Sequence, residues 1–87
     1  MIIRFHKQFS KQLQKMPKKK QEIIKNKLKV FLLDPYQTQL NNHSLNGRYQ
    51  NYRSLNVSGD LRAIFKLSDD GKEAFFIVIG NHNQLYS

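Results

Sequence analysis

The sequence predicts an α+β domain, in which a short amino-terminal strand and a two-helix hairpin pack on an antiparallel sheet of about four strands. Two observations lead to this prediction. Apolar residues recur at helical spacing through the first third of the chain, and three later segments rich in aromatic and β-branched residues are separated by turn sequences. Helices that precede a run of strands are typical of α+β domains, where they gather on one face of the sheet.

The chain begins with apolar residues typical of a short strand over residues 2–6. Phe9, Leu13 and Met16 then follow at spacings of i, i+4 and i+7, with lysines recurring on the other faces. This pattern predicts an amphipathic helix whose outer surface is basic.

A second helix is predicted to begin close to Pro17, because proline is tolerated in the first turn of a helix but not in its interior. Its core face is formed by apolar residues at helical spacing, which are Ile24, Leu28, Phe31 and Leu32. The Asp34-Pro35 pair ends this helix at about Leu33, since the residue before a proline is pushed out of the helical region. The two helices therefore form a short hairpin.

Three strands are predicted over residues 49–57, 61–67 and 73–79, after a connecting loop over residues 34–47 that is rich in turn-forming residues. Ser58-Gly59 and the segment Ser68-Asp69-Asp70-Gly71 supply the two turns between them. The last strand is apolar on both faces, which indicates a central position in the sheet.

The middle strand has two chemically different faces. Leu61, Ala63, Phe65 and Leu67 share one face, whereas Arg62 and Lys66 share the other with Ile64. One face therefore belongs to the core, and the other offers cations to a ligand.

The composition limits the classes of protein that are possible. Eighty-seven residues suffice for one compact domain, and no linker or repeat divides the chain, so a single domain over residues 1–87 is expected. No apolar run approaches the roughly 20 residues that span a bilayer, and the amino terminus lacks a secretory pattern, which predicts a cytoplasmic protein with no membrane partner. The absence of cysteine excludes disulfides, thiolate metal sites and cysteine nucleophiles.

The net charge of +9 is segregated along the chain. Residues 1–33 hold ten Lys or Arg and one acid, whereas residues 34–87 hold five of each sign. A basic surface of this kind favours a polyanionic partner such as nucleic acid, although it is equally typical of a well-solvated helix pair.

The candidate site residues are polar side chains at strand ends and in loops. They are His43, Arg53, Asn56, Asp60, Arg62, His82 and Tyr86. The sequence has no Gly-rich phosphate loop, no HExxH motif and no acidic metal-binding motif, so neither a metal nor another cofactor is expected. Such a set fits RNA cleavage by the RNA's own 2′-hydroxyl, which needs a base, an acid and a cation that stabilises the phosphorane.

Each of these residues also has an ordinary structural interpretation. The two histidines could belong to a turn and to a strand end, and Asp60 could be a turn acceptor. Arg53 and Arg62 could be solvated strand charges, and Tyr86 could be a packing residue at the terminus.

The order of elements and three local motifs resemble the RelE/ParE toxin superfamily, and within it the YafQ-like branch. The motifs are His43-Ser44-Leu45-Asn46-Gly47, the strand and turn from Tyr52-Arg53 to Gly59-Asp60, and Gly80 to Tyr86, read as G-N-H-N-Q-L-Y. The resemblance covers nearly the whole chain.

The resemblance implies a set of functional residues. His82 matches a catalytic histidine and is the best candidate for general acid or base, with His43 and Asp60 assisting and Tyr86 placing the substrate. Contacts to RNA are implied for a second set of residues, which are Arg53, Arg62, Lys66 and Asn56, together with Lys11, Lys15 and Lys18 on the basic helices.

Two positions depart from the branch's pattern. Asn56 stands where the branch has another histidine, and Leu61 stands where it has a tryptophan. Asparagine can form hydrogen bonds but cannot transfer protons, so catalysis would rest on fewer groups.

The resemblance implies the toxin of a type II toxin–antitoxin system, which cuts mRNA on the ribosome, contacts ribosomal RNA and is silenced by a cognate antitoxin. Two alternatives are a ParE-like inhibitor of DNA gyrase and a non-catalytic protein that binds RNA or the ribosome. The two histidines argue against the gyrase inhibitor, whereas Asn56 and the basic helices suit the non-catalytic protein.

Overall fold

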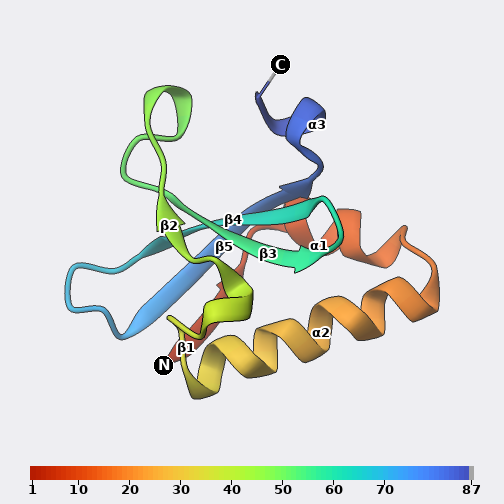
Figure 1. Ribbon diagram of the computed structural model, residues 1–87, viewed down its shortest axis with the longest axis horizontal. Helices are drawn as coiled ribbons and strands as arrows, with labels where there is room; N and C mark the ends of the chain where they lie inside the picture. Colours follow the sequence, from red (N-terminus) through yellow and green to blue (C-terminus); the bar gives the residue numbers. More distant parts are fainter. Residues whose placement is uncertain (87) are drawn as a thin grey trace.

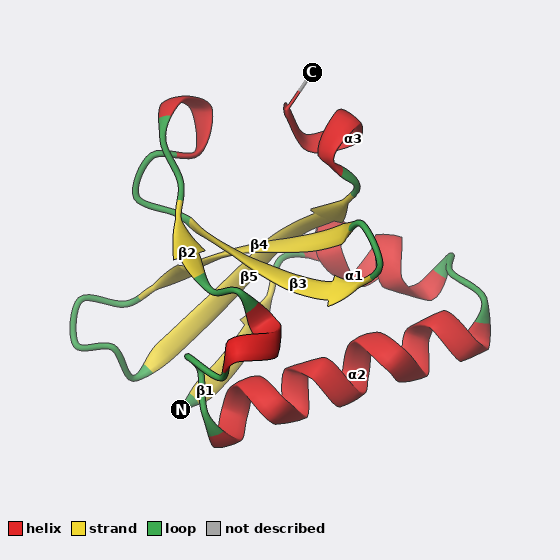
Figure 2. Cartoon of the chain, viewed as in Figure 1, coloured by secondary structure: helices red, strands yellow, loops and turns green. Residues whose placement is uncertain are grey.

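The computed structural model describes residues 1–86 and has the predicted α+β architecture (Figure 1). In chain order its elements are β1 (Ile2–Phe5), α1 (Lys7–Gln14), α2 (Lys18–Leu33), β2 (His43–Ser44), β3 (Arg53–Ser58), β4 (Leu61–Leu67), β5 (Glu73–Gly80) and α3 (His82–Tyr86). Two short 3₁₀ turns, Thr38–Leu40 and Gly47–Tyr49, flank β2. Figure 2 shows α1 and α2 as a hairpin on one side of the sheet, with α3 on another side.

The sheet has five strands in the order β1-β5-β4-β3-β2, so the expectation of an antiparallel sheet of about four strands needs two corrections. First, β1 pairs with β5 and runs parallel to it. The first and last strands of the chain are neighbours at this edge of the sheet, and the two helices and the other three strands lie between them in the sequence. Second, β2 pairs with the start of β3 inside the segment that was expected to be a loop. A two-residue strand is too short to show an alternating pattern in the sequence.

The predicted helices agree with the structure except at their ends. Pro17 is the N-cap of α2, and Asp34 ends that helix in an extended conformation. α1 is shorter than predicted and ends at Gln14, although Met16 still packs against the core. His6 caps α1, because its Nδ1 accepts a hydrogen bond from the amide of Gln8 at 3.0 Å.

The main core lies between the helix hairpin and one face of the sheet. α1 packs mainly on β5, and α2 packs on β3. The centre is a group of aromatic rings in which Phe76 of β5 contacts Phe65 at 4.9 Å, Phe31 at 5.5 Å and Phe9 at 5.7 Å between ring centroids. All four rings are fully buried. As predicted, alternate residues of β4 face this core.

A second buried group lies on the opposite face of the sheet, beneath α3. Ile64 of β4, Ser54 of β3 and Leu85 of α3 are buried, but none of them belongs to the helix-side core. Gly80 lies where β5 meets α3, and a Cβ atom there would approach the Leu85 side chain to 3.3 Å. The turn into α3 is therefore closely packed at Gly80, and Leu85 anchors the helix on the sheet.

β5 continues past the end of β1, and α1 covers this continuation. The last residue of β1, Phe5, pairs with Phe76, so the backbone from Ile77 onward has no strand beside it on that edge. The Gln12 side chain of α1 accepts a hydrogen bond from the amide of Ile79 at 2.9 Å. In residues 1–86, no helix is both long and apolar enough to cross a membrane.

The alternation of β5 side chains between the two faces of the sheet can be tested by substituting two neighbouring phenylalanines. Phe76→Ala should lower the free energy of unfolding by about 3–5 kcal/mol, because it removes the ring at the centre of the core. Phe75→Ala should cost much less, since Phe75 lies on the other face and is 40% exposed. Urea unfolding followed by circular dichroism measures the free energy of unfolding of both variants. Equal losses of stability would contradict the placement of Phe75 and Phe76 on opposite faces of the sheet.

Candidate active site

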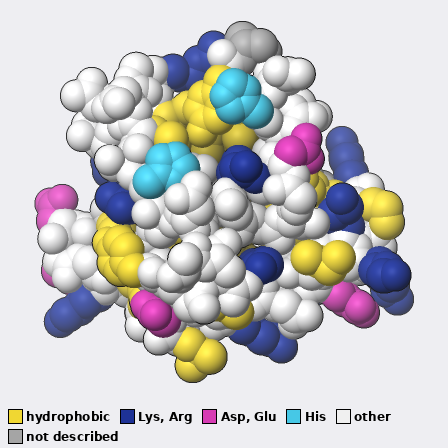
Figure 3. All heavy atoms as spheres, in the orientation of Figure 1, with side chains coloured by type: hydrophobic (Ala, Val, Ile, Leu, Met, Phe, Trp, Pro, Cys, Tyr) yellow, Lys and Arg dark blue, Asp and Glu magenta, His cyan; other side chains and the backbone are white. Residues whose placement is uncertain are grey.

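An open hollow of about 280 Å³ lies on the face of the sheet opposite the helix hairpin. It is lined by residues from five segments, which are His43, Leu45, Ser54, Arg62, His82 and Tyr86. Figure 3 shows two histidine side chains on this face on either side of an apolar surface, with a cationic side chain close by. Four of the predicted site residues therefore meet in one place.

The strand register brings the hollow's residues together. His43 of β2 pairs with Ser54 of β3, and Ser54 pairs with Ile64 of β4, so these side chains form one row on this face. Arg62 lies two residues from Ile64 on the same strand and therefore on the same face. His43 lies close to Arg62 only because β2, β3 and β4 pair side by side in the sheet.

His43 is held by a hydrogen bond between its Nδ1 and the carbonyl oxygen of Asn41, at 2.7 Å. A carbonyl only accepts, so Nδ1 carries the proton and Nε2 of the neutral ring is left as an acceptor. Asn41 has a φ of 45°, in the left-handed region that asparagine tolerates, and this conformation ends the preceding 3₁₀ turn. The arrangement can present a basic nitrogen to the hollow.

Arg62 is oriented by the turn between β3 and β4. Its Nη1 donates hydrogen bonds to the carbonyl oxygens of Gly59 and Leu61, both at 3.1 Å. A guanidinium has three further N–H donors, in a planar arrangement that suits a phosphate. The side chain can therefore stabilise negative charge that develops in the hollow.

α3 carries the other two site residues, and the sequence analysis did not predict this helix. Asn81 Oδ1 accepts from the amide of Gln84, and Gln84 Oε1 accepts from the amide of Asn81, both at 2.8 Å. This reciprocal capping could have been found from the Asn-x-x-Gln spacing. The helix brings the rings of His82 and Tyr86 to 4.9 Å between centroids.

Two loop residues that the sequence analysis missed support α3. Arg48 donates a hydrogen bond to the carbonyl oxygen of Leu85 at 3.5 Å, and the ring of Tyr49 lies edge-on to that of Tyr86 at 5.9 Å. No local pattern could have indicated these contacts, because they join residues 37 positions apart in the chain.

Two predicted site residues lie beside the hollow without lining it. Asp60 is exposed in the turn after Gly59. Asn56 pairs with Arg62 across β3 and β4, and its Oδ1 is buried with no hydrogen-bond partner in residues 1–86. An amide oxygen that lacks a partner is available to a donor on a ligand.

Arg53 does not reach the hollow. It pairs with Phe65, whose side chain belongs to the helix-side core, and it shares that face. Its Nε donates to Asn42 Oδ1 at 2.7 Å, and its guanidinium lies 5.6 Å from the ring centre of Tyr36. The structure thus separates Arg53 from Arg62 by the thickness of the sheet.

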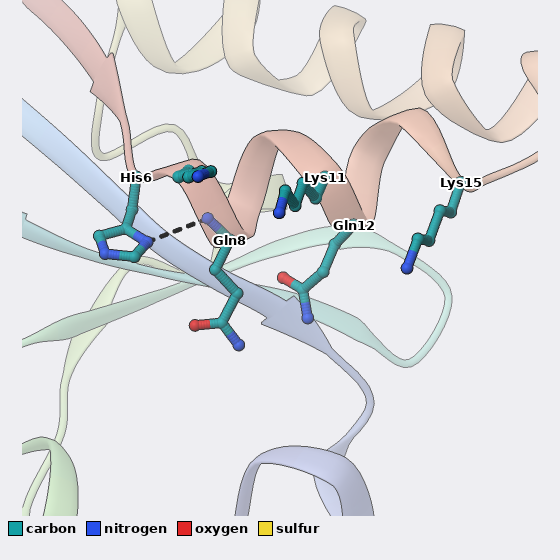
Figure 4. A pocket seen from close by; sticks show the side chains of 6 residues that line it. His6, Gln8, Lys11, Gln12 and Lys15 are labelled. Carbon is teal, nitrogen blue, oxygen red and sulfur yellow. Dashed lines mark hydrogen bonds between the residues drawn. The ribbon is translucent and has the colours of Figure 1, made fainter.

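The predicted lysines lie at three separate places. Lys11 and Lys15 line a groove of about 440 Å³ along α1, together with His6, Lys7, Gln8 and Gln12 (Figure 4). Lys18 is the first residue of α2 and does not line this groove. Lys66 is exposed on the open sheet face, with its Nζ 5.9 Å from the ring centre of Tyr52.

The hollow combines the groups that a phosphodiester cleavage needs: a histidine with a free acceptor nitrogen, a second histidine on the other side, and a guanidinium between them in the lining. In residues 1–86, no three His, Cys, Asp or Glu side chains are close enough to hold a metal ion. The chemistry available from the side chains is proton transfer and stabilisation of an oxyanion.

Comparison with known proteins gives one family. The model of the YafQ family, described as a bacterial toxin of a type II toxin–antitoxin system, matches residues 1–87. A search of curated protein sequences found no match.

Solved structures agree with the family model. The crystal structure of YafQ from E. coli strain BL21(DE3) is 28% identical, with a TM-score of 0.75 over 98% of this chain and 97% of that chain. YafQ in the E. coli DinJ-YafQ complex is 26% identical, with a TM-score of 0.66 over 98% and 97%. The archaeal RelE-RelB complex from Pyrococcus horikoshii OT3 matches at 19% identity and a TM-score of 0.76 over 95% and 96%, which shows a common fold.

The anchoring of α3 can be tested by shortening Leu85. Leu85→Ala should free the helix from the sheet, because Leu85 supplies its buried side chain. Hydrogen exchange should then accelerate at the backbone amides of positions 84 and 85, whereas the amides of β4 and β5 should stay protected. Leu33→Ala, at a site that is 89% exposed, is the matched control. Unchanged exchange in α3 would contradict this role of Leu85.

Proposed function

The chain belongs to the YafQ family of bacterial toxins of type II toxin–antitoxin systems, and from this membership and the hollow on its sheet we propose that it is a ribosome-dependent endoribonuclease. Its substrate is mRNA under translation, and cleavage needs no metal ion. The observation that carries this proposal is the pair of histidines that line one hollow with Arg62.

In the proposed reaction, Nε2 of His43 takes the proton from a 2′-hydroxyl of the mRNA. The 2′-oxygen then forms a bond to the adjacent phosphorus, while the bond from phosphorus to the 5′-oxygen breaks. His82 protonates that leaving oxygen. The products are a 2′,3′-cyclic phosphate and a 5′-hydroxyl, so atoms and protons balance without a co-reactant.

The other site residues have supporting roles in the proposal. Arg62 stabilises the charge on the phosphorane, a contribution that is typically worth about 3–4 kcal/mol for one well-placed donor. Tyr86 places a base of the substrate by stacking beside His82. Asp60 acts indirectly, since it follows the glycine whose carbonyl oxygen holds Arg62. The unpartnered Oδ1 of Asn56 accepts a donor on the substrate.

The basic helices are proposed to dock the toxin on ribosomal RNA. Lys7 and Lys11 of α1 and Lys15 at its C-cap repeat every four residues and line one groove. Figure 4 labels Lys11 and Lys15 in this groove. A groove with several cations and few acids suits phosphate groups, and the phosphate contacts fix orientation rather than sequence. The reacting groups would then face the mRNA from the other side of the sheet.

We also propose a cognate antitoxin as the natural inhibitor. A solved structure of E. coli DinJ with YafQ is a toxin–antitoxin complex, and the archaeal RelE of similar fold was solved in complex with RelB. A net charge of +9 favours an acidic partner.

The first test is cleavage by His82→Ala in a cell-free bacterial translation reaction. Mapping of mRNA 5′ ends should show new ends inside the reading frame with the wild-type protein, and a loss of about 10²- to 10⁴-fold in the rate of cleavage with the variant. His43→Ala should lose activity in the same range, while Leu33→Ala should retain it.

A reaction blocked at initiation is the control for dependence on the ribosome. Cleavage that persists there would contradict ribosome dependence, and cleavage by His82→Ala at the wild-type rate would remove His82 from the mechanism. Intact mRNA with salt-sensitive binding to ribosomes would indicate the non-catalytic binding protein instead.

The docking role of α1 predicts a change in salt dependence. The double variant Lys11→Gln, Lys15→Gln should bind ribosomes more weakly, and its log-log slope against salt should fall by about 1.4–1.8 if each lysine neutralises one phosphate. Lys29→Gln, on the exposed surface of α2, is the matched control. An unchanged slope in ribosome sedimentation assays would place the docking surface elsewhere.

A further inference from the structure

A row of alternating aromatic and cationic side chains crosses the open face of the sheet, outside the hollow. Lys66 of β4 pairs with Phe75 of β5, and Phe75 pairs with Arg4 of β1. Tyr52, just before β3, completes the row, with its ring centre 5.9 Å from Lys66 Nζ. The row is therefore Tyr52, Lys66, Phe75 and Arg4, with neighbouring strands about 4.8 Å apart.

Lys66, Phe75 and Arg4 are exposed and Tyr52 is half-buried, and none of the four belongs to the helix-side core. Phe75 is 40% exposed, although its neighbour Phe76 is completely buried. The Arg4 side chain is 65% exposed. The ring of His6 meets the ring of Phe75 edge-on, at 6.0 Å between centroids. An exposed aromatic ring flanked by cations is a surface that the fold alone does not require.

The charged groups around the row favour the binding of an anion and limit how far a polyanion can extend along this face. Glu73 pairs with Nε of Arg4 at 2.7 Å, so the charges of these two groups offset each other. The guanidinium of Arg4 has four further N–H donors for a phosphate, and Lys66 supplies the net positive charge of the row. Asp69 and Asp70 lie in the turn beyond the end of β4. Hydrogen bonds from the Ser68 hydroxyl and the Lys72 amide lower the pKa of Asp70, which therefore stays negative. These carboxylates discourage a polyanion from continuing past the turn.

The row is continuous with the hollow. Lys66 lies four residues from Arg62 on β4, on the same face, which corresponds to about 13 Å along a strand. Buried Ile64 lies between them and makes the floor. On the side of β3, the rings of Tyr52, Tyr49 and Tyr86 form a chain of edge-on contacts that ends beside His82.

We propose that this row is a track for the single-stranded RNA that leaves the hollow, and this identification of the occupant rests on the proposed function. Bases stack on Tyr52 and Phe75, and phosphates lie over Lys66 and Arg4. Alternating aromatic and cationic groups are what single-stranded nucleic acid binds, because every base has a face that can stack and the backbone is uniformly charged. The track extends the substrate's contacts across the sheet from β3 to β1.

The test is RNA binding by the full chain in a His82→Ala background, so that cleavage does not interfere. Fluorescence anisotropy with a short, labelled single-stranded RNA of mixed sequence gives the Kd. Phe75→Ala should weaken binding by roughly 5- to 150-fold, the range for the loss of one base–aromatic stack. Phe75→Trp should bind as tightly as the parent protein, because it restores a stacking surface.

Matched variants separate stacking from other effects. Leu33→Ala removes an exposed apolar side chain far from the sheet face and should leave the Kd unchanged. Lys66→Gln should lower the log-log salt slope by about 0.7, as one phosphate contact to a single strand is lost. If Phe75→Ala does not fold, as judged by circular dichroism, Phe75→Leu keeps the apolar bulk and should show the same loss of binding.

The outcomes distinguish the track from the nuclease. RNA binding by both Phe75→Ala and Phe75→Leu that equals binding by Leu33→Ala overturns the track, even if the wild-type protein cuts translated mRNA. Failure of the parent protein to bind RNA overturns it as well. Binding that depends on Phe75, in a protein that cuts no mRNA during translation, keeps the track and rejects the nuclease.

Discussion

The packing of aromatic rings around Phe76 is the constraint on which the rest of the structure depends. This ring contacts Phe65 on the neighbouring strand and Phe31 and Phe9 on the two helices, so it joins the sheet and the hairpin at one point. In a small domain, such a group supplies a large share of the apolar area that is buried. Because side chains alternate along β5, fixing Phe76 in the core turns Phe75 outward. The burial of Phe76 therefore determines which face of the sheet is free for a ligand.

The free face carries the candidate site because three backbone features orient its side chains. Asn41 adopts a left-handed conformation and its carbonyl oxygen accepts a hydrogen bond from His43 Nδ1, which leaves the other nitrogen of that ring as an acceptor. The turn after β3 holds Arg62 by two carbonyl oxygens. The reciprocal caps of Asn81 and Gln84 start the helix that carries His82. Each feature is local, and the sheet brings the three together.

Cations occur on both sides of the molecule and have different surroundings. The lysines of α1 line an exposed groove and suit sequence-independent contacts to phosphates. Arg62 and Lys66 lie on the open sheet face, next to histidine and aromatic rings that can interact with bases. Asn56 pairs with Arg62 across β3 and β4, and its buried oxygen lacks a partner in residues 1–86, but its amide cannot transfer protons. The reaction proposed for this YafQ-family protein therefore assigns both proton transfers to His43 and His82.

Elements whose signals are local could be predicted from the amino-acid sequence. Helical spacing predicted the hairpin, and alternation predicted the two faces of β4, with Arg62 on the open one. The motifs that resemble the YafQ-like branch pointed to His43, His82 and Tyr86, and the structure brings all four residues into one hollow. Four other features are visible only in the folded chain, which are the parallel pairing of β1, the short strand β2, the position of Arg53 on the helix side and the contact of Arg48 with α3. These features depend on which strands pair and in which register, and a shift of one residue exchanges the two faces of a strand. Local patterns cannot specify pairing between distant segments, because that choice is made by the packing of the whole core.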